Sequence, residues 1–254
     1  MNDLVSINIV THNRAQYIGD AVRSILSQDY ENWEIIIIDD CSTDNTKNIV
    51  KDFTEDERIK YYLVNKQKNI SAVRNIALGY SQGQYIAVLD SDDMWCDNTK
   101  LSKQVNFFKE NPEYVVVGSS AIAINEENKE IDKILKPVTD KEIRDIFLTK
   151  NPFMHSSVVF NRKIVYEVGK YNEGISYGED FDLFLRLGKV GKLYNLPNFF
   201  IKYRIHEGNE ASKHTFKAIF DVFKIINKNR KSYNISPVIY LQKIFKKFFE
   251  IIKK

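Results

Sequence analysis

Two short apolar runs, each ending in a group of carboxylates, constrain this chain of 254 residues more than any other feature. The first run is Glu34–Ile38, followed by Asp39-Asp40, and the second is Tyr85–Leu89, followed by Asp90-Ser91-Asp92-Asp93. Runs of this kind are typical of strands buried in a parallel sheet. Because ligands of open α/β sheets bind beyond the carboxyl ends of the strands, both acidic groups are expected at a binding edge.

The second acidic group has the chemistry of a cation site. Asp90, Asp92 and Asp93 lie within four positions, and so many carboxylates cannot all stay ionised in a dry site without a cation. Oxygen ligands on a turn suit Mn²⁺ or Mg²⁺. The alternative is a solvated acidic turn that caps the next helix, and the second strand with the same ending argues against it.

The order of expected elements predicts the fold class. In the first half, strands alternate with helices whose apolar residues share one face. We expect Asn13 to cap the first helix and Leu26 to lie on its inward-facing side. The expected strands are 5–10, 34–38, 59–64 and 85–89, and the expected helices are 14–26, 42–53, 71–80 and 101–112. This succession predicts an α/β fold with a doubly wound, mostly parallel sheet flanked by helices.

The second half is less regular. We expect strands at 114–124, 156–160, 192–196 and 199–203, and helices at 162–168 and 181–190. From residue 209 the chain is expected to be helical, with a break at Ser236-Pro237.

The charge distribution and the cysteine content indicate the environment in which the protein works. Residues 213–254 hold eleven Lys or Arg against Asp221 and Glu250, a net charge of +9, which leaves −6 for the rest of a chain whose total is +3. Cys41 and Cys96 show no metal-site spacing, which favours a reduced, cytoplasmic setting. We expect neither a signal peptide nor a membrane-spanning helix.

The sequence lacks the motifs of two common classes of nucleotide-binding protein. The turn after the first strand reads Thr11-His12-Asn13-Arg14-Ala15-Gln16 and lacks the glycines that let a backbone approach a pyrophosphate. The chain also lacks the G-x-x-x-x-G-K-[ST] pattern of a P-loop. A nucleotide would therefore be held by side chains and a metal ion.

Taken together, the motifs resemble family 2 glycosyltransferases of the GT-A fold. The ordered pieces span about 210 residues: 5–14, 38–44, Arg74-Asn75, 83–93, His155-Ser156-Ser157, 178–183 and 203–206. The resemblance implies a GT-A domain over residues 1–208, with a nucleotide-binding half (1–112) and an acceptor-binding half (113–208). A basic, amphipathic helical extension would occupy 209–254.

The resemblance also implies roles on the donor side. Asp40 would accept a hydrogen bond from the base, which is expected to be uracil, Asp90 would hold the ribose, and Asp92 would bind the metal ion. Arg74 would face the phosphates or, as the alternative, brace the acidic cluster. The remaining positions implied in nucleotide binding are Thr11, His12, Asn13, Arg14, Asn69 and Ser91, and the metal set is Asp90, Asp92, Asp93 and His206.

On the acceptor side, the resemblance assigns the general base to Asp180, with Glu179 beside it. A sugar hydroxyl is a poor nucleophile and needs a base within about 3 Å, whereas the metal ion stabilises the leaving nucleoside diphosphate. The alternative is that both carboxylates only cap an apolar helix. His155 would line the acceptor cleft, and the alternative for His206 is a structural role.

The expected activity is inverting, metal-dependent transfer of a sugar from a nucleotide sugar, expected to be UDP-linked, to a hydroxyl of a bacterial surface glycan or its lipid-linked precursor. A protein that only binds the nucleotide sugar, or a membrane-associated scaffold, is the alternative. Residues 238–254 place apolar side chains on one helical face and lysines on the other. They predict peripheral contact with the inner face of the membrane; packing on the protein's own domain or in a homodimer is the alternative, and nucleic acid is not an expected partner.

Overall fold

The computed structural model describes residues 3–147, 150–207 and 216–233, and confirms the expected α/β class. The first half contains β1 (Val5–Thr11), α1 (Ala15–Leu26), β2 (Trp33–Asp40), α2 (Thr46–Lys51), β3 (Ile59–Val64), α3 (Ile70–Tyr80), β4 (Tyr85–Val88), β5 (Met94–Trp95) and α4 (Lys100–Glu110). The second half contains β6 (Tyr114–Ile124), β7 (Glu130–Ile134), α5 (Asp140–Ile146), β8 (Val159–Asn161), α6 (Arg162–Glu167), α7 (Glu179–Leu187), β9 (Lys192–Arg204) and α8 (Phe216–Asn229).

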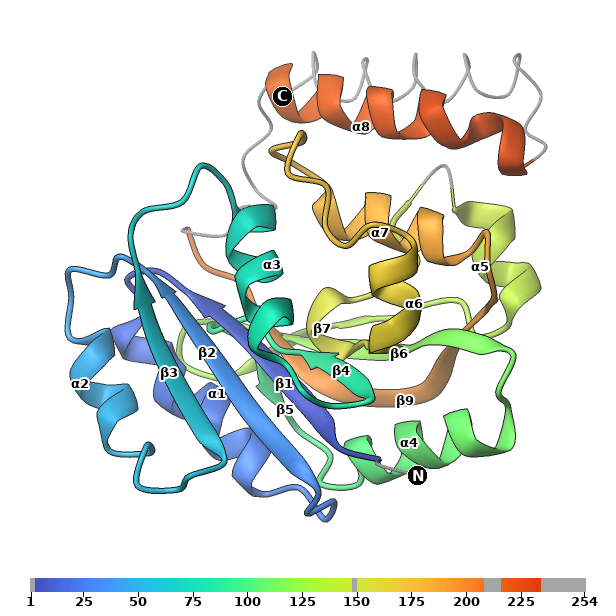
Figure 1. Ribbon diagram of the computed structural model, residues 1–254. Helices are drawn as coiled ribbons and strands as arrows, with labels where there is room; N and C mark the ends of the chain where they lie inside the picture. The colour runs from blue at the N-terminus through green and yellow to red at the C-terminus, as the bar shows by residue number, and fades with distance from the viewer. Residues whose placement is uncertain (1–2, 148–149, 208–215, 234–254) are drawn as a thin grey trace.

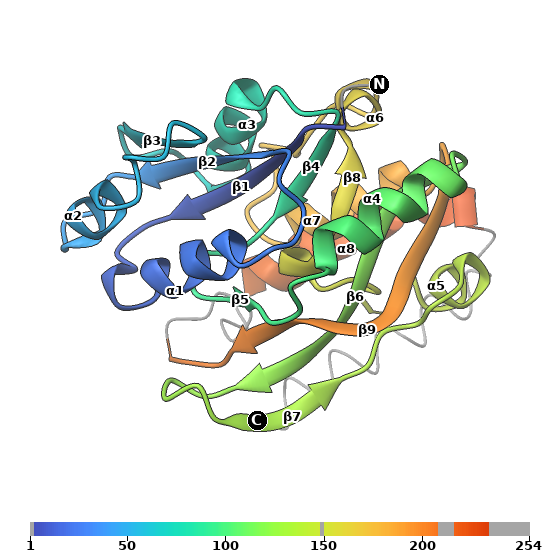
Figure 2. The same ribbon diagram turned by 90° about the horizontal axis from the view of Figure 1, so that it is seen from below.

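The described strands form one sheet in the order β3-β2-β1-β4-β8-β6-β9-β5, with β7 added along β6. Strands β1 to β4 are parallel to one another, whereas β8 runs antiparallel to both β4 and β6. The sheet therefore changes from parallel to antiparallel pairing where β4 meets β8, a strand of the second half of the chain (Figure 2).

Helices cover both faces of the sheet (Figure 2). Alternate residues of β1, such as Val5, Ile7 and Ile9, pack with α1, α2 and α4 in one core cluster. On the other face, Ile36 and Ile38 pack with α3, and Ile86 and Val88 pack with α3, α5, α6, α7 and α8. Strands buried on both faces explain the nearly continuous apolar runs in the sequence.

Several local expectations were wrong. Asn13 does not cap α1: its φ is +51°, and its side-chain oxygen accepts a hydrogen bond from the Thr43 N–H instead. Leu26 is exposed rather than inward-facing. The expected helix at 42–53 covers only Thr46–Lys51, the strand expected at 156–160 begins at Val159, and the two short strands expected after Lys192 are one strand, β9.

The described part of the C-terminal extension packs against the rest of the molecule. α8 lies over α7 (Figure 1), with Ile225 buried in the same core cluster as Leu183 and Leu185. Tyr233, just after α8, donates a hydrogen bond from its hydroxyl to the Leu185 carbonyl. The break expected at Ser236-Pro237 and the amphipathic segment 238–254 lie outside the described residues.

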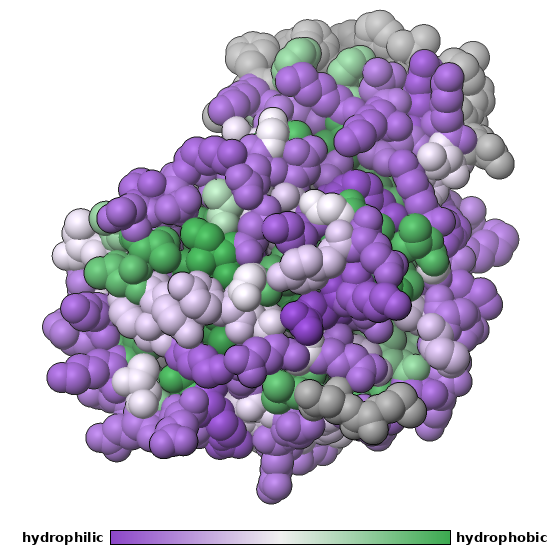
Figure 3. Space-filling view, in the orientation of Figure 1, coloured by the Kyte–Doolittle hydropathy of each residue, from purple (hydrophilic) through white to green (hydrophobic). Residues whose placement is uncertain are grey.

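In the described part of the chain, no helix is long and apolar enough to cross a membrane. The face seen in Figure 1 is mostly hydrophilic, with apolar side chains reaching it on the side of β3 and α3 (Figure 3). Tyr80, in α3, is exposed and stacks on Tyr62 of β3.

Candidate active site

The carboxyl ends of β1, β2 and β4 meet at one edge of the sheet. β1 pairs in parallel with β2, so that Thr11 lies opposite Asp39, and pairs in parallel with β4 on its other side. This register brings Thr11, Asp40 and Asp90 to the same edge. The Thr11 hydroxyl is buried there without a hydrogen-bond partner, and an unsatisfied buried hydroxyl at a strand end suits contact with a ligand.

Asp40 already has two protein partners. One of its oxygens accepts a hydrogen bond from the Gln67 N–H at 2.7 Å, and the other lies 2.7 Å from the Lys66 ammonium. Lys66 is 57% exposed and can move away at little cost. Contact between Asp40 and a base therefore stays a prediction.

Asp92 brings together side chains from three segments. Its Oδ2 atom lies 3.3 Å from Arg14 Nε, in the turn before α1, and 3.0 Å from His206 Nε2, just after β9. The carboxylate keeps 16% of its surface exposed, so a ligand can reach it. Arg14, Asp92 and His206, predicted separately from the sequence, are thus neighbours.

Asp93 is engaged within the protein. It is buried, and its two oxygens accept hydrogen bonds from the Ser156 hydroxyl and the Arg204 backbone N–H. Burial and the charges of Asp92 and Asp90 raise the pKa of Asp93 well above its ordinary value. Asp93 thus ties the turn after β4 to β9, and its expected role as a metal ligand stays a prediction.

Arg74 connects the donor side to the acceptor side. This buried side chain lies 3.0 Å from Asp90 Oδ1 and 3.3 Å from Glu179 Oε1. Burial alone would raise the pKa of Asp90, but the Arg74 guanidinium and His155 outweigh it and hold the pKa below its usual range. This geometry favours the alternative in which Arg74 braces the acidic cluster over the one in which it faces phosphates.

His155 lies against the same network. Its Nδ1 atom is 3.7 Å from Asp90 Oδ1, and its Nε2 atom is 2.9 Å from the hydroxyl of Tyr171. Burial raises the pKa of Tyr171, so this hydroxyl stays protonated. Tyr171 was not identified from the sequence, since nothing in the local pattern marks it.

Glu179 and Asp180 begin α7 directly after Gly178, whose φ of +78° is a left-handed conformation that glycine adopts freely. Burial, with the neighbouring Asp180 charge, raises the pKa of Glu179 despite Arg74. Asp180 faces elsewhere: its Oδ2 accepts a hydrogen bond from the Asn151 amide at 2.6 Å. Of these two carboxylates, Glu179 is paired with Arg74, whereas Asp180 forms no ion pair in the described residues.

Other predicted nucleotide contacts have structural duties. Asn69 caps α3, accepting from the Ala72 N–H, while its amide donates to the carbonyls of Glu173 and Ile175. Asn69 thus has a capping role, and its expected contact with a nucleotide stays a prediction. Asn13 ties the β1 turn to the β2 turn, His12 is exposed beside it, and Ser91 is buried.

The described residues provide only part of a metal site. No three His, Cys, Asp or Glu side chains among them are grouped so that they alone would hold a metal ion. Asp92 and His206 supply one oxygen and one nitrogen donor next to each other, whereas Asp90 is engaged by Arg74. Any ion here would take its remaining ligands from the substrate or water.

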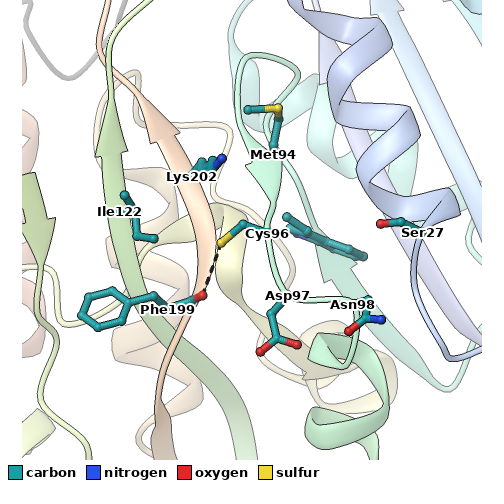
Figure 4. Close-up of a pocket in the computed structure, with 9 residues that line it drawn as sticks. Ser27, Met94, Cys96, Asp97, Asn98, Ile122, Phe199 and Lys202 are labelled. Carbon is teal, nitrogen blue, oxygen red and sulfur yellow. Dashed lines mark hydrogen bonds between the residues drawn. The ribbon is translucent and has the colours of Figure 1, made fainter. Parts of the chain in front are cut away.

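A separate pocket of about 680 Å³ opens between the end of α1 and strands β5, β6 and β9 (Figure 4). Its lining includes Met94, Ile122, Phe199 and Lys202, but none of the predicted site residues. The Cys96 thiol donates a hydrogen bond to the Phe199 carbonyl, and burial raises its pKa to about 11. A thiol so rarely ionised is a poor nucleophile.

Comparison with known proteins identifies the family of the chain. The model of the family "Glycosyl transferase family 2" matches residues 6–169. The chain is 32% identical over 212 residues to the Escherichia coli UDP-Glc:alpha-D-GlcNAc-diphosphoundecaprenol beta-1,3-glucosyltransferase WfgD, covering 82% of this chain and 80% of the relative.

Two solved structures share the fold. One is S. aureus TarS 1-349 in complex with UDP-GlcNAc, with a TM-score of 0.74 at 18% identity, covering 94% of this chain and 70% of TarS 1-349. The other is the mannosyltransferase PcManGT from Pyrobaculum calidifontis in complex with GDP-Man and Mn²⁺, with a TM-score of 0.68 at 16% identity, covering 89% and 64%. The family model spans the strands that carry Thr11, Asp40 and Asp90, and the chain belongs to glycosyltransferase family 2.

Proposed function

We propose that this glycosyltransferase moves a sugar from a UDP-sugar, with inversion, to a hydroxyl of a lipid-linked glycan precursor. One observation carries the proposal: Arg74 joins Asp90, at the sheet edge, to Glu179, next to Asp180 at the start of α7. A donor held at the strand ends would thus lie beside a carboxylate able to activate the acceptor.

The donor side would use the residues at the strand ends. The buried Thr11 hydroxyl and Asp40 would bond the nucleoside, and Asp92 with His206 would hold Mn²⁺ or Mg²⁺. When bound, the ion offsets the charge of the leaving nucleoside diphosphate, so no general acid is needed. The adjacent Arg14 guanidinium adds positive charge at the same point.

Asp180 would take the proton from the acceptor hydroxyl. As that oxygen forms its bond to the anomeric carbon, the bond from this carbon to the diphosphate oxygen breaks on the opposite face, which inverts the centre. Glu179 is less suited to the task because Arg74 occupies it. The uridine nucleotide and the lipid-linked acceptor are supported by the relative described above, whose name states a UDP-Glc donor and a diphosphoundecaprenol-linked acceptor.

Calorimetric titration with UDP, in the presence and absence of Mn²⁺, tests the donor side. Asp92→Asn keeps the shape of the side chain but removes its charge, so we expect Mn²⁺-dependent UDP binding to be lost. Asp145→Asn, on the exposed side of α5, is the matched control and should bind as the wild type does. Unchanged affinity of Asp92→Asn would refute the assignment.

Transfer of labelled sugar from a panel of UDP- and GDP-sugars to a short polyprenyl-diphosphate-linked sugar tests the reaction. Asp180→Asn should lower the transfer rate about 10²-fold or more while UDP still binds. Transfer at a near wild-type rate would assign the base elsewhere, and binding without transfer by the wild type would favour a protein that only binds its nucleotide sugar.

A further inference from the structure

The side-chain amide of Asn151 is fixed in one orientation. Its Oδ1 atom accepts a hydrogen bond from the Phe153 backbone N–H at 3.2 Å. Its Nδ2 group must therefore point the other way, and it donates to Asp180 Oδ2 at 2.6 Å. The second oxygen of Asp180 accepts from the Phe181 N–H at 2.7 Å, so both oxygens are held from known directions.

Lys136 supports Asn151 from behind. Its ammonium donates a hydrogen bond to the Asn151 carbonyl at 3.0 Å, and it forms no ion pair within the described ranges. Burial lowers the pKa of Lys136 to about 8, with the nearby Asp180 opposing the shift. At neutral pH the ammonium is thus mostly charged, and it is a positive charge near the Asp180 carboxylate.

A third side chain holds these two segments together. Asn195, in β9, donates from its amide to the Pro137 carbonyl at 2.7 Å and to the Pro152 carbonyl at 3.0 Å. Each of these prolines is the chain neighbour of one of the two residues, Lys136 or Asn151. The arrangement is therefore anchored on the central sheet rather than on a loose loop, as a positioning device needs.

We propose that Asn151, backed by Lys136, is the positioning residue for Asp180, holding the carboxylate in the orientation in which it receives the acceptor proton. The proposal rests on the proposed role of Asp180 as the base. The charged and titratable groups around Asp180 in the described residues are Lys136, Glu179 of the same helix and Tyr171. Lys136 is the cation among them, and Lys150 lies near Lys136.

The test is the pH dependence of transfer by the full-length enzyme. Asn151→Asp replaces the donating amide with a second carboxylate, which should move the acidic limb of the kcat profile upward by about one pH unit or more. At pH 7, kcat should fall about tenfold because the amide that orients Asp180 is lost, with KM for the UDP-sugar unchanged. Asn106→Asp, exposed on α4, adds the same charge elsewhere and should leave the profile unmoved.

Further variants keep the result decisive. Thermal unfolding and UDP binding would reveal whether Asn151→Asp folds. If it does not, two other variants replace it. Asn151→Ala should lower kcat without changing KM for the donor, and Lys136→Gln should move the acidic limb of the kcat profile upward. An unmoved profile with wild-type kcat in these variants would overturn the proposal. If Asp180→Asn itself keeps full transfer, the base assignment fails instead, and the two failures are distinguishable.

Discussion

At the scale of single residues, the site depends on one buried cation between two carboxylates. Arg74 is 7% exposed at its side chain and meets both Asp90 and Glu179. Removing one member of a buried ion pair leaves an uncompensated charge, which is far more costly than losing a surface pair. The same three residues that connect donor and acceptor sides therefore also stabilise the fold.

We expect Arg74→Met to lower the free energy of unfolding by about 3 kcal/mol, measured by urea denaturation at pH 7. Arg23→Met removes an exposed pair with Asp20 and should cost about 0.5 kcal/mol or less. Because the pKa of Asp90 is lowered in the fold, its contribution is present above about pH 4 and is lost as the pH falls further. Equal costs for the two variants would contradict this account.

At the scale of elements, α7 depends on the glycine that precedes it. Gly178 has a φ of +78°, and a Cβ there would touch Ile225 Cδ1 of α8 at 3.4 Å, an ordinary contact. The cost of a side chain at this position is therefore in the backbone conformation and not in crowding. Glu179 and Asp180 follow immediately, so the same turn sets their direction.

Gly178→Ala is expected to destabilise the protein by about 1 kcal/mol, because L-residues avoid the left-handed region. Transfer should fall with it, since any change of the turn moves Asp180. Gly79→Ala is the control: it lies in α3, where a Cβ would meet nothing within 4 Å, and it should stabilise by about 0.5 kcal/mol or more. Thermal unfolding and a transfer assay compare the two, and a stabilised Gly178→Ala would be the contrary result.

The elements also explain what could be predicted from the sequence. β1, β2 and β4 were predictable because strands buried on both faces are mostly apolar, and β3 because it is rich in aromatic and β-branched residues. β5 has only two residues, and β7 is mostly exposed and charged, so neither has a recognisable pattern. α5 carries a sequence signal of its own, because Thr139 and Glu142 form a capping box.

Among the candidate site residues, too, some features could be predicted from the sequence and others could not. The positions of Asp90 and Asp92, in the turn after β4, and of Asp180, in the first turn of α7, could be predicted because each lies beside a regular element. Their chemical roles stay predictions. The duties of Asp93 and Asn69 could not be predicted, because they depend on partners in β9 and in the loop before α7. The contact between Asn151 and Asp180 joins residues 29 positions apart, and no periodicity connects them.

At the scale of the whole molecule, the charge is unevenly distributed, with a basic C-terminal part on an acidic body. Residues 238–254, which lie outside the described residues, alternate apolar and lysine positions at helical spacing. A lipid-linked acceptor would require the enzyme to reach a membrane surface. Contact between this segment and the inner leaflet therefore stays a prediction.

Flotation with anionic liposomes tests it, comparing the full chain with one ending at Pro237, which retains α8. We expect the full chain to float and the shortened chain to float less, with binding that weakens as salt is added. Each lysine near an anionic surface contributes about 1 kcal/mol. Equal flotation, or none by either protein, would mean that the segment instead covers its own domain or a partner subunit.

α8 has a further consequence for how this enzyme becomes active during its synthesis. Asp221 of α8 accepts a hydrogen bond from the Ser176 N–H, and Val222 and Ile225 pack over Gly178, so the turn before Asp180 is held by residues more than forty positions later. The turn that directs the proposed base is therefore completed only when α8 has been synthesised and has docked, later in the chain than the strand ends that are proposed to hold the donor.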